Sequence, residues 1–124
     1  MKEIMAIIRM NKVAATKKAL AEAGFCGLTA AKAMGRGKLL KDLSLLDKVQ
    51  DENRDMVLES LLKGGRLIPK RLLTIVVKDG DVQKAVDTII AVNKEGNIGD
   101  GKIFVLPLID VVRVRTGEQG EAAV

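Results

Sequence analysis

The sequence predicts an α+β fold in which a strand, a helix and a second strand follow one another twice. Two short β-branched runs, at residues 2–9 and 72–78, are each followed by a segment rich in Ala, Leu and Val with helical spacing. The chain has 124 residues, which suffices for one core and is too short for two independent ones. We therefore expect a single domain over residues 1–124.

The first unit begins with a strand at residues 2–9 (KEIMAIIR). Asn11 is the expected N-cap of a helix over residues 12–23, and Gly24 is the expected residue that ends it. Residues 25–33 read as the second strand, and GRGK at 35–38 follows it.

The second unit repeats this order with a strand at residues 72–78. Asp81 can cap a helix that runs to about Asn93, and Gly96 follows its end. Residues 102–105 read as the fourth strand. The helix residues expected to face the core are Val82, Ala85, Val86, Ile89 and Ile90.

Two such units give the split βαβ, or ferredoxin-like, arrangement, with a four-stranded antiparallel sheet and both helices on one face. The opposite face then needs a cover, and in a chain of this length self-association supplies it most simply. Residues 111–115 read as a further short strand.

A long excursion, residues 36–71, separates the two units. It is not of low complexity, because leucines recur in it at helical spacings and Gly64-Gly65 closes the second leucine-rich segment. Loops of this length in compact domains are uncommon unless they are functional. Two interpretations stay open: a helical hairpin that lies on the sheet, and a segment whose posture changes with a ligand.

A glycine-rich run, GNIGDGK at residues 96–102, precedes the fourth strand. Glycines let the backbone turn tightly and approach a ligand closely, and Lys102 ends the run with a positive charge. Arg113 and Arg115 are two residues apart, which would place both on one face of a strand. This combination is typical of a polyphosphate cradle. The alternative is a glycine-rich hairpin loop beside solvated charges.

Composition excludes several classes of function. The net charge of +5 favours a phosphate-bearing partner, but the 2% aromatic content argues against a nucleic-acid reader that stacks bases. The chain has no histidine and one cysteine, Cys26, which we expect to be a buried thiol, so zinc sites and Ser-His or Cys-His nucleophiles are excluded. No apolar run is long enough to span a bilayer, and we expect a cytoplasmic protein.

Several longer motifs recur in one known family: MKEI with IIR at 7–9, GRGK at 35–38, VDTII at 86–90, IGDGKIFV at 98–105 and VRVRTGE at 112–118. By these motifs the chain resembles the PII signal-transduction family over nearly its whole length. IPKRLLTIVV at residues 68–77 and the tyrosine-free excursion are similar to its archaeal nitrogen-fixation branch.

The resemblance implies a trimer that binds ATP or ADP in clefts between neighbouring subunits. Gly99, Asp100, Gly101 and Lys102 match the phosphate loop, and Arg113 and Arg115 of an adjacent subunit would neutralise the phosphates. The positions that match the remaining nucleotide contacts are Ile7, Thr29, Gly35, Gly37, Lys38, Thr74 and Val76. Lys38 replaces a frequent arginine and Thr74 a frequent glutamate.

The resemblance also implies that 2-oxoglutarate binds beside Mg-ATP, with Lys70 holding its distal carboxylate. The glutamine that helps to ligate Mg²⁺ falls at position 39, where this chain has Leu39. Leucine offers no oxygen to a hard cation, so no metal ligand is assigned.

The function that the resemblance implies is regulation of nitrogenase by protein contacts through the excursion, which is the T-loop of the family. A sister PII-like subunit is an expected partner, so the oligomer is homomeric or heteromeric and built on trimers. The first alternative is a PII protein that regulates an ammonium transporter, which would bring it to a membrane. An enzyme that hydrolyses or transfers phosphate is the second, and we do not expect it, because Asp100 has no neighbouring base.

Overall fold

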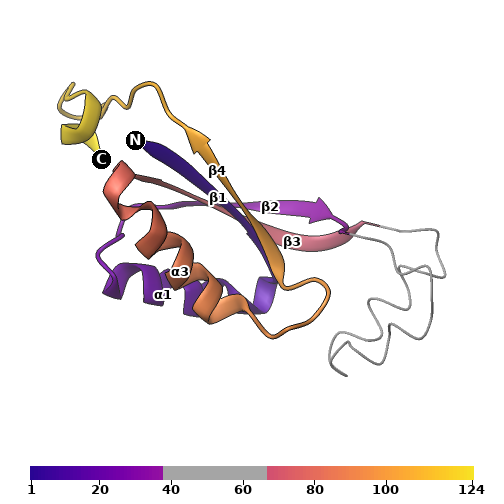
Figure 1. The fold of residues 1–124 in the computed structure, drawn as a ribbon. Helices are drawn as coiled ribbons and strands as arrows, with labels where there is room; N and C mark the ends of the chain where they lie inside the picture. Colours follow the sequence, from indigo (N-terminus) through magenta and orange to yellow (C-terminus); the bar gives the residue numbers. More distant parts are fainter. Residues whose placement is uncertain (38–66) are drawn as a thin grey trace.

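The computed structural model describes residues 1–37 and 67–124. Its four strands form one sheet in the order β2-β3-β1-β4, and all neighbouring strands are antiparallel. The helices α1 and α3 lie against one face of that sheet (Figure 1). The elements are β1 (Lys2–Ile8), α1 (Val13–Glu22), β2 (Thr29–Gly35), β3 (Ile68–Val77), α3 (Val82–Asn93) and β4 (Gly101–Pro107), with 3₁₀ turns at Met10–Lys12, Asp79–Asp81 and Gly120–Ala123. The predicted ferredoxin-like α+β fold is confirmed.

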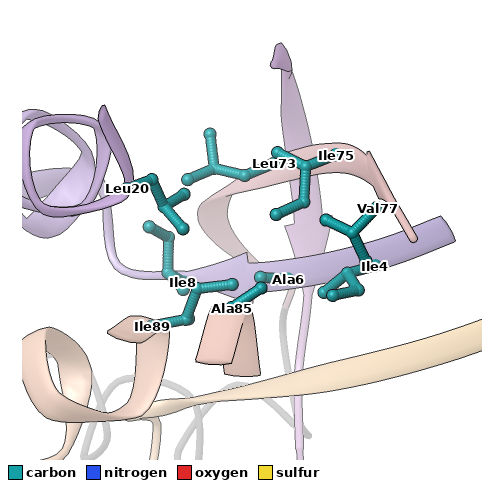
Figure 2. Close-up of a cluster of buried hydrophobic side chains, with 9 residues drawn as sticks. All are labelled: Ile4, Ala6, Ile8, Leu20, Leu73, Ile75, Val77, Ala85 and Ile89. Carbon is teal, nitrogen blue, oxygen red and sulfur yellow. The ribbon is translucent and has the colours of Figure 1, made fainter. Parts of the chain in front are cut away.

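The core lies between the sheet and the two helices. Ile4, Ala6 and Ile8 alternate along β1 and are at most 1% exposed, as expected for a strand with one buried face. Figure 2 shows them packed with residues from β3 and both helices. The other members of the cluster are Leu20, Leu73, Ile75, Val77, Ala85 and Ile89. Aliphatic packing therefore stabilises the layered arrangement.

Helix α1 ends as predicted and begins differently. Gly24 has a φ of 98°, and the amide of Phe25 donates to the Leu20 carbonyl at 2.8 Å, which is the Schellman closure of a helix. Asn11 is not the N-cap: it lies within the 3₁₀ turn, and Lys12 occupies the cap position without a side-chain hydrogen bond. The chain therefore passes through a 3₁₀ turn where a capping side chain was expected.

Helix α3 has the predicted extent, from the Asp81 cap position to Asn93. The Asp81 side chain makes no capping hydrogen bond, so only its position is as expected. Ile90 is 42% exposed, and its assignment to the core was wrong. Ala85 and Ile89 already fill the contact with the sheet, and Ile90 lies on the outer side of the helix.

Residues 25–28 are not part of a strand, although the sequence suggested one from residue 25. The Phe25 amide is used to close α1, and Phe25 and Leu28 pack on the core from an irregular connection. Cys26 in that connection is exposed, so the expectation of a buried thiol was also wrong. β2 begins only at Thr29.

β3 begins at Ile68, earlier than the predicted strand at 72–78. Residues 68–71 pair with residues 32–35 of β2, so they belong to the sheet and not to the predicted 36–71 excursion. Pro69 is tolerated there because β1 ends at Ile8 opposite Arg71, which leaves Pro69 with a strand on one side only. The helical content predicted for the rest of the excursion falls on residues 38–66, outside the described part of the chain.

The predicted strand at 111–115 was wrong. Only one isolated bridge, between Val112 and Gln119, forms in this segment. The amide of Gly117 donates to the Arg113 carbonyl at 2.7 Å, and Gly117 has a φ of 74°, so the chain reverses after Arg113. A tight turn therefore replaces extended backbone, and Arg115 lies within it.

The sheet face away from the helices carries apolar side chains without a cover in one chain. Register places Met5 opposite Phe104, and Phe104 is 44% exposed. Leu106 on the same face is 36% exposed. Among the described residues, no helix is both long and apolar enough to cross a membrane.

Candidate functional site

The glycine run predicted to bind phosphate forms the connection from α3 to β4, at one end of the sheet (Figure 1). Its tip is a turn in which the Asp100 amide donates to the Asn97 carbonyl at 3.2 Å. Gly99 has a φ of 94° in this turn, a conformation that favours glycine. Gly101 has a φ of 128°, and a Cβ there would lie 2.3 Å from the Ile7 carbonyl oxygen. The close approach to β1 therefore requires glycine at position 101.

Asp100 organises this loop through its carboxylate. Oδ2 accepts hydrogen bonds from the amides of Glu95, Gly96 and Asn97 at 2.8, 2.9 and 3.2 Å. Oδ1 accepts a hydrogen bond from Arg9 Nη1 at 2.7 Å. Both oxygens of the Asp100 side chain are thus used inside the protein, and the carboxylate fixes the path of the loop.

Arg9, directly after β1, anchors the same loop from the sheet side. Its residue surface is 7% exposed, and Nη2 donates to the Ile98 carbonyl at 3.1 Å. Glu95 lies 3.6 Å from Nη1 and also pairs with Lys12 at 2.8 Å. A buried cation with several acceptors is satisfied without water. Arg9 and Asp100 together therefore tie residues 95–100 to the end of β1.

Lys70 reaches the loop from β3. Its Nζ donates to the Gly99 carbonyl at 3.0 Å. Burial lowers the pKa of Lys70, and the nearby positive charge of Arg9 lowers it further, while Asp100 raises it. The predicted effector lysine and the predicted phosphate loop are consequently in direct contact.

Burial alone would raise the pKa of Asp100, since it disfavours the charged carboxylate. Hydrogen bonds from Arg9 and from the amides of Glu95 and Asn97 act in the other direction and prevail, so the pKa is lowered below 3.8. Asp100 is therefore ionised at neutral pH.

The strand register shows where the other predicted nucleotide contacts lie. Ile7 is directly opposite Lys102, on the sheet face away from the helices. Thr29 is opposite Thr74 on the same face, and Val76 is two residues further along β3. Gly35 is the last residue of β2 and Gly37 follows it, while Lys38 lies outside the described residues. One chain thus brings together Ile7, Lys102 and Lys70, with the Thr29–Thr74 pair further across the sheet.

Arg113 and Arg115 are not near the loop of the same chain. β4 runs from Gly101, opposite Ile8, to Pro107, opposite Lys2, so later residues leave at the other end of the sheet, about 20 Å away for a seven-residue strand (Figure 1). Arg113 instead pairs with Glu118 at 3.0 Å. Within one chain, the glycine loop and Lys102 therefore lie together, and Arg113 and Arg115 lie at the other end of the sheet.

Arg9 was not among the predicted site residues, although it contacts Asp100, Ile98 and Glu95 of the loop. It is separated from Asp100 by 91 positions, so no local pattern connects the two. The available signal was a charged residue at the end of a buried apolar strand, where a fixed counter-charge is expected.

Known proteins are similar to this chain over nearly its whole length. The family model described as "Nitrogen regulatory protein P-II" matches residues 1–118. A protein of Methanothermococcus thermolithotrophicus named "Nitrogen fixation nifHD region GlnB-like protein 2" is 48% identical over 100% of this chain and 98% of its own length. A protein of the same name from Methanobacterium ivanovii is 45% identical over 100% of this chain and 99% of its own.

A solved structure of Arabidopsis thaliana PII bound to citrate has a similar fold. Its TM-score is 0.74 at 33% sequence identity, and the match covers 99% of this chain and 91% of that one. The "Nitrogen regulatory protein P-II 2" of Methanothermobacter thermautotrophicus is 42% identical over 100% of this chain and 97% of its own length.

Proposed function

The chain belongs to the nitrogen regulatory protein P-II family, and from this we propose that it binds ATP and ADP between subunits and regulates nitrogenase through protein contacts. Membership makes it a regulatory protein and not an enzyme.

Backbone donors in the glycine loop support nucleotide binding. Asp100 occupies the amides of Glu95, Gly96 and Asn97, whereas the amides of Ile98 and Gly99 have no protein acceptor within the described residues. Free amides at a glycine turn, beside a lysine, suit phosphate oxygens. Lys102 is exposed and has no ion-pair partner among the described residues, so its charge is available. This is the observation on which the proposal chiefly depends.

The missing arginines support a site between copies. Arg113 and Arg115 lie at the far end of the sheet from Lys102, yet both lie within residues 1–118, which the family model matches. Two copies placed with one C-terminal segment against the next loop would bring the arginines to the phosphates. The uncovered apolar face at Met5 and Phe104 provides a surface for such an assembly. We propose a trimer, formed by this chain alone or with a sister chain.

Lys70 supports a carboxylate effector, for which we propose 2-oxoglutarate. It is a partly buried cation whose only hydrogen bond within the described residues is to the Gly99 carbonyl, a neutral acceptor that a carboxylate could replace. The Arabidopsis relative is bound to citrate, which is also a polycarboxylate. No group of three or more His, Cys, Asp or Glu side chains within the described residues could hold a metal ion, so the proposal assigns no Mg²⁺ ligand from the chain.

Relatives named for the nifHD region favour nitrogenase as the target. The contact would be made by the segment that connects β2 to β3, whose posture would depend on the bound nucleotide. Such control requires that ATP and ADP differ in affinity for the two postures, and tenfold control takes about 1.4 kcal/mol.

Calorimetric titration of the purified chain with ADP and ATP tests the nucleotide site. We expect saturable binding by the parent chain and at least about tenfold weaker binding by Lys102→Ala, since one charge-assisted contact is lost. Lys78→Ala is the matched control, because Lys78 is exposed and follows β3 at the opposite end of the sheet. Failure of the parent chain to bind either nucleotide would refute the proposal.

Co-purification from extract tests the target. Nitrogenase recovered with the chain supports the proposal, and recovery with the membrane fraction would instead identify an ammonium transporter as the target.

A further inference from the structure

We propose that Arg9 is a positioning residue for nucleotide phosphates, acting through Asp100, and that the Asp100 carboxylate itself does not contact the ligand. This inference rests on the proposed nucleotide site and assigns a role to a residue outside the predicted set.

The contacts of Asp100 leave it no free oxygen toward a ligand. Oδ1 is 2.7 Å from Arg9 Nη1, and Oδ2 accepts three amides between 2.8 and 3.2 Å. A carboxylate would also repel phosphate at close range. The Asp100 carboxylate therefore acts within the protein, where it accepts hydrogen bonds from the amides of residues 95–97. The amides of Ile98 and Gly99, at the tip of the turn, are left without an acceptor within the described residues.

Arg9 holds that arrangement in place. It is the buried cation that neutralises Asp100, and through Nη2 it also binds the Ile98 carbonyl at 3.1 Å. The Ile98 carbonyl therefore faces the protein. Carbonyls directed inward leave the turn amides free for an anion.

Arg9 also contributes charge close to the lysine side of the loop. A Cβ on Gly99 would meet Arg9 Nη2 at 3.4 Å and Lys70 Nζ at 3.5 Å, so both cations border the same glycine. Loss of Arg9 would remove a fixed contact on one side of Gly99 and leave only Lys70 on the other. The loop would then sample other conformations. Part of the binding free energy would be used to order it, and the affinity for phosphate would fall.

Titrations of the full chain with ATP, ADP and AMP test this inference. We expect Arg9→Gln and Asp100→Asn each to weaken ADP binding at least about tenfold, since each breaks a charge-assisted contact that orders the loop. The ADP affinity of the double variant should lie within about twofold of the lower of the two single-variant affinities, because the two residues act as a unit. The loss should grow from AMP to ADP to ATP, whereas general loosening of the fold would weaken all three alike.

Lys94→Gln is the matched control, since it removes one exposed positive charge beside the loop and should leave ADP affinity within about twofold. Amide exchange gives a readout without nucleotide: Glu95, Gly96 and Asn97 should exchange faster in Arg9→Gln than in the parent chain. If Arg9→Gln does not fold, Asp100→Asn, which changes one atom of the same contact, decides the question.

The outcomes separate the two proposals. ADP binding by the parent chain that Arg9→Gln and Asp100→Asn leave unchanged would overturn this inference alone. An equal loss of AMP, ADP and ATP affinity would also overturn it. No binding by the parent chain would overturn the proposed function and this inference together.

Discussion

Gly101 shows how a single residue sets the geometry of the loop. It starts β4 with a φ of 128°, and any side chain there would collide with the Ile7 carbonyl 2.3 Å away. The obstacle is backbone of the central strand β1, which cannot move aside as a flexible side chain could. The position therefore requires glycine for both conformation and space.

We predict that Gly101→Ala destabilises the fold by about 2–4 kcal/mol, through backbone strain and the contact with Ile7. Gly80→Ala is the control, because Gly80 has open space around it and no positive φ, and its effect should lie between zero and about 1 kcal/mol of stabilisation. Urea unfolding measures both. Equal stability of the two variants would contradict the explanation.

Asp100 gives the molecule a defined response to acid. Its pKa is lowered in the folded chain, so its contribution to stability is present above the ordinary value of 3.8 and is lost as pH falls below it. We predict that Asp100→Asn is less stable than the parent chain at pH 7 by about 1–3 kcal/mol. At a pH well below 3.8 the difference should largely vanish. Urea unfolding of both proteins at pH 7 and in acid measures this difference in stability. A difference that persists in acid would contradict this account.

At the scale of elements, the local pattern predicted most of the fold and failed where distant residues intervene. Helix α3 was correct in extent because its apolar spacing and its flanking residues agree. The start of β2 was wrong because the Phe25 amide closes α1, which no strand pattern in residues 25–28 can reveal. The segment at 111–115 was wrong because Gly117 reverses the chain. For the candidate site, the sequence identified the glycine run as a loop but missed its anchor Arg9, which lies 91 positions from Asp100.

The two helices are joined by a buried polar contact. Asn93 Nδ2 donates to Thr16 Oγ1 at 3.0 Å and to the Ile89 carbonyl at 2.8 Å, and Thr16 is fully buried. Thr16 Oγ1 in turn donates to the Lys12 carbonyl at 2.7 Å. This contact fixes the end of α3, just before the glycine loop, against the first turns of α1.

We predict that Thr16→Val destabilises the fold by about 1–3 kcal/mol, because the Asn93 amide loses a buried acceptor. Thr88→Val is the matched control: Thr88 donates to the Lys84 carbonyl in the same way but is more exposed, and its effect should stay within about 0.5 kcal/mol. Thermal or urea unfolding compares them, and equal losses would show that the interhelical contact is unimportant.

At the scale of the whole molecule, the sheet has one covered face and one open face. The helices cover Ile4, Ala6 and Ile8, whereas Met5 and Phe104 lie opposite each other on the open side. We propose that a second copy of the chain covers this apolar face, since it provides the same surface. The loop and the C-terminal segment at opposite ends of the sheet can then meet only between copies.

We predict that Phe104→Glu abolishes assembly, since a carboxylate on the open face would be buried without a partner. Light scattering should then give the 13.3 kDa of one chain instead of three times that mass. Ile90→Glu is the control, because Ile90 is exposed to a similar degree, 42% against 44%, but lies on α3. Assembly that survives Phe104→Glu would place the interface elsewhere.

The central claim, that a nucleotide site is completed by two copies, is tested most directly by mixing two inactive variants. Lys102→Ala removes the loop lysine and Arg113→Ala removes an arginine of the C-terminal segment, so neither alone should bind ADP well. When equal amounts are unfolded and refolded together, about a quarter of the clefts should combine an intact loop with an intact arginine, as random assembly of a cyclic oligomer requires. Calorimetry should then recover about that fraction of high-affinity ADP sites. A mixture that binds no better than either variant would contradict the account.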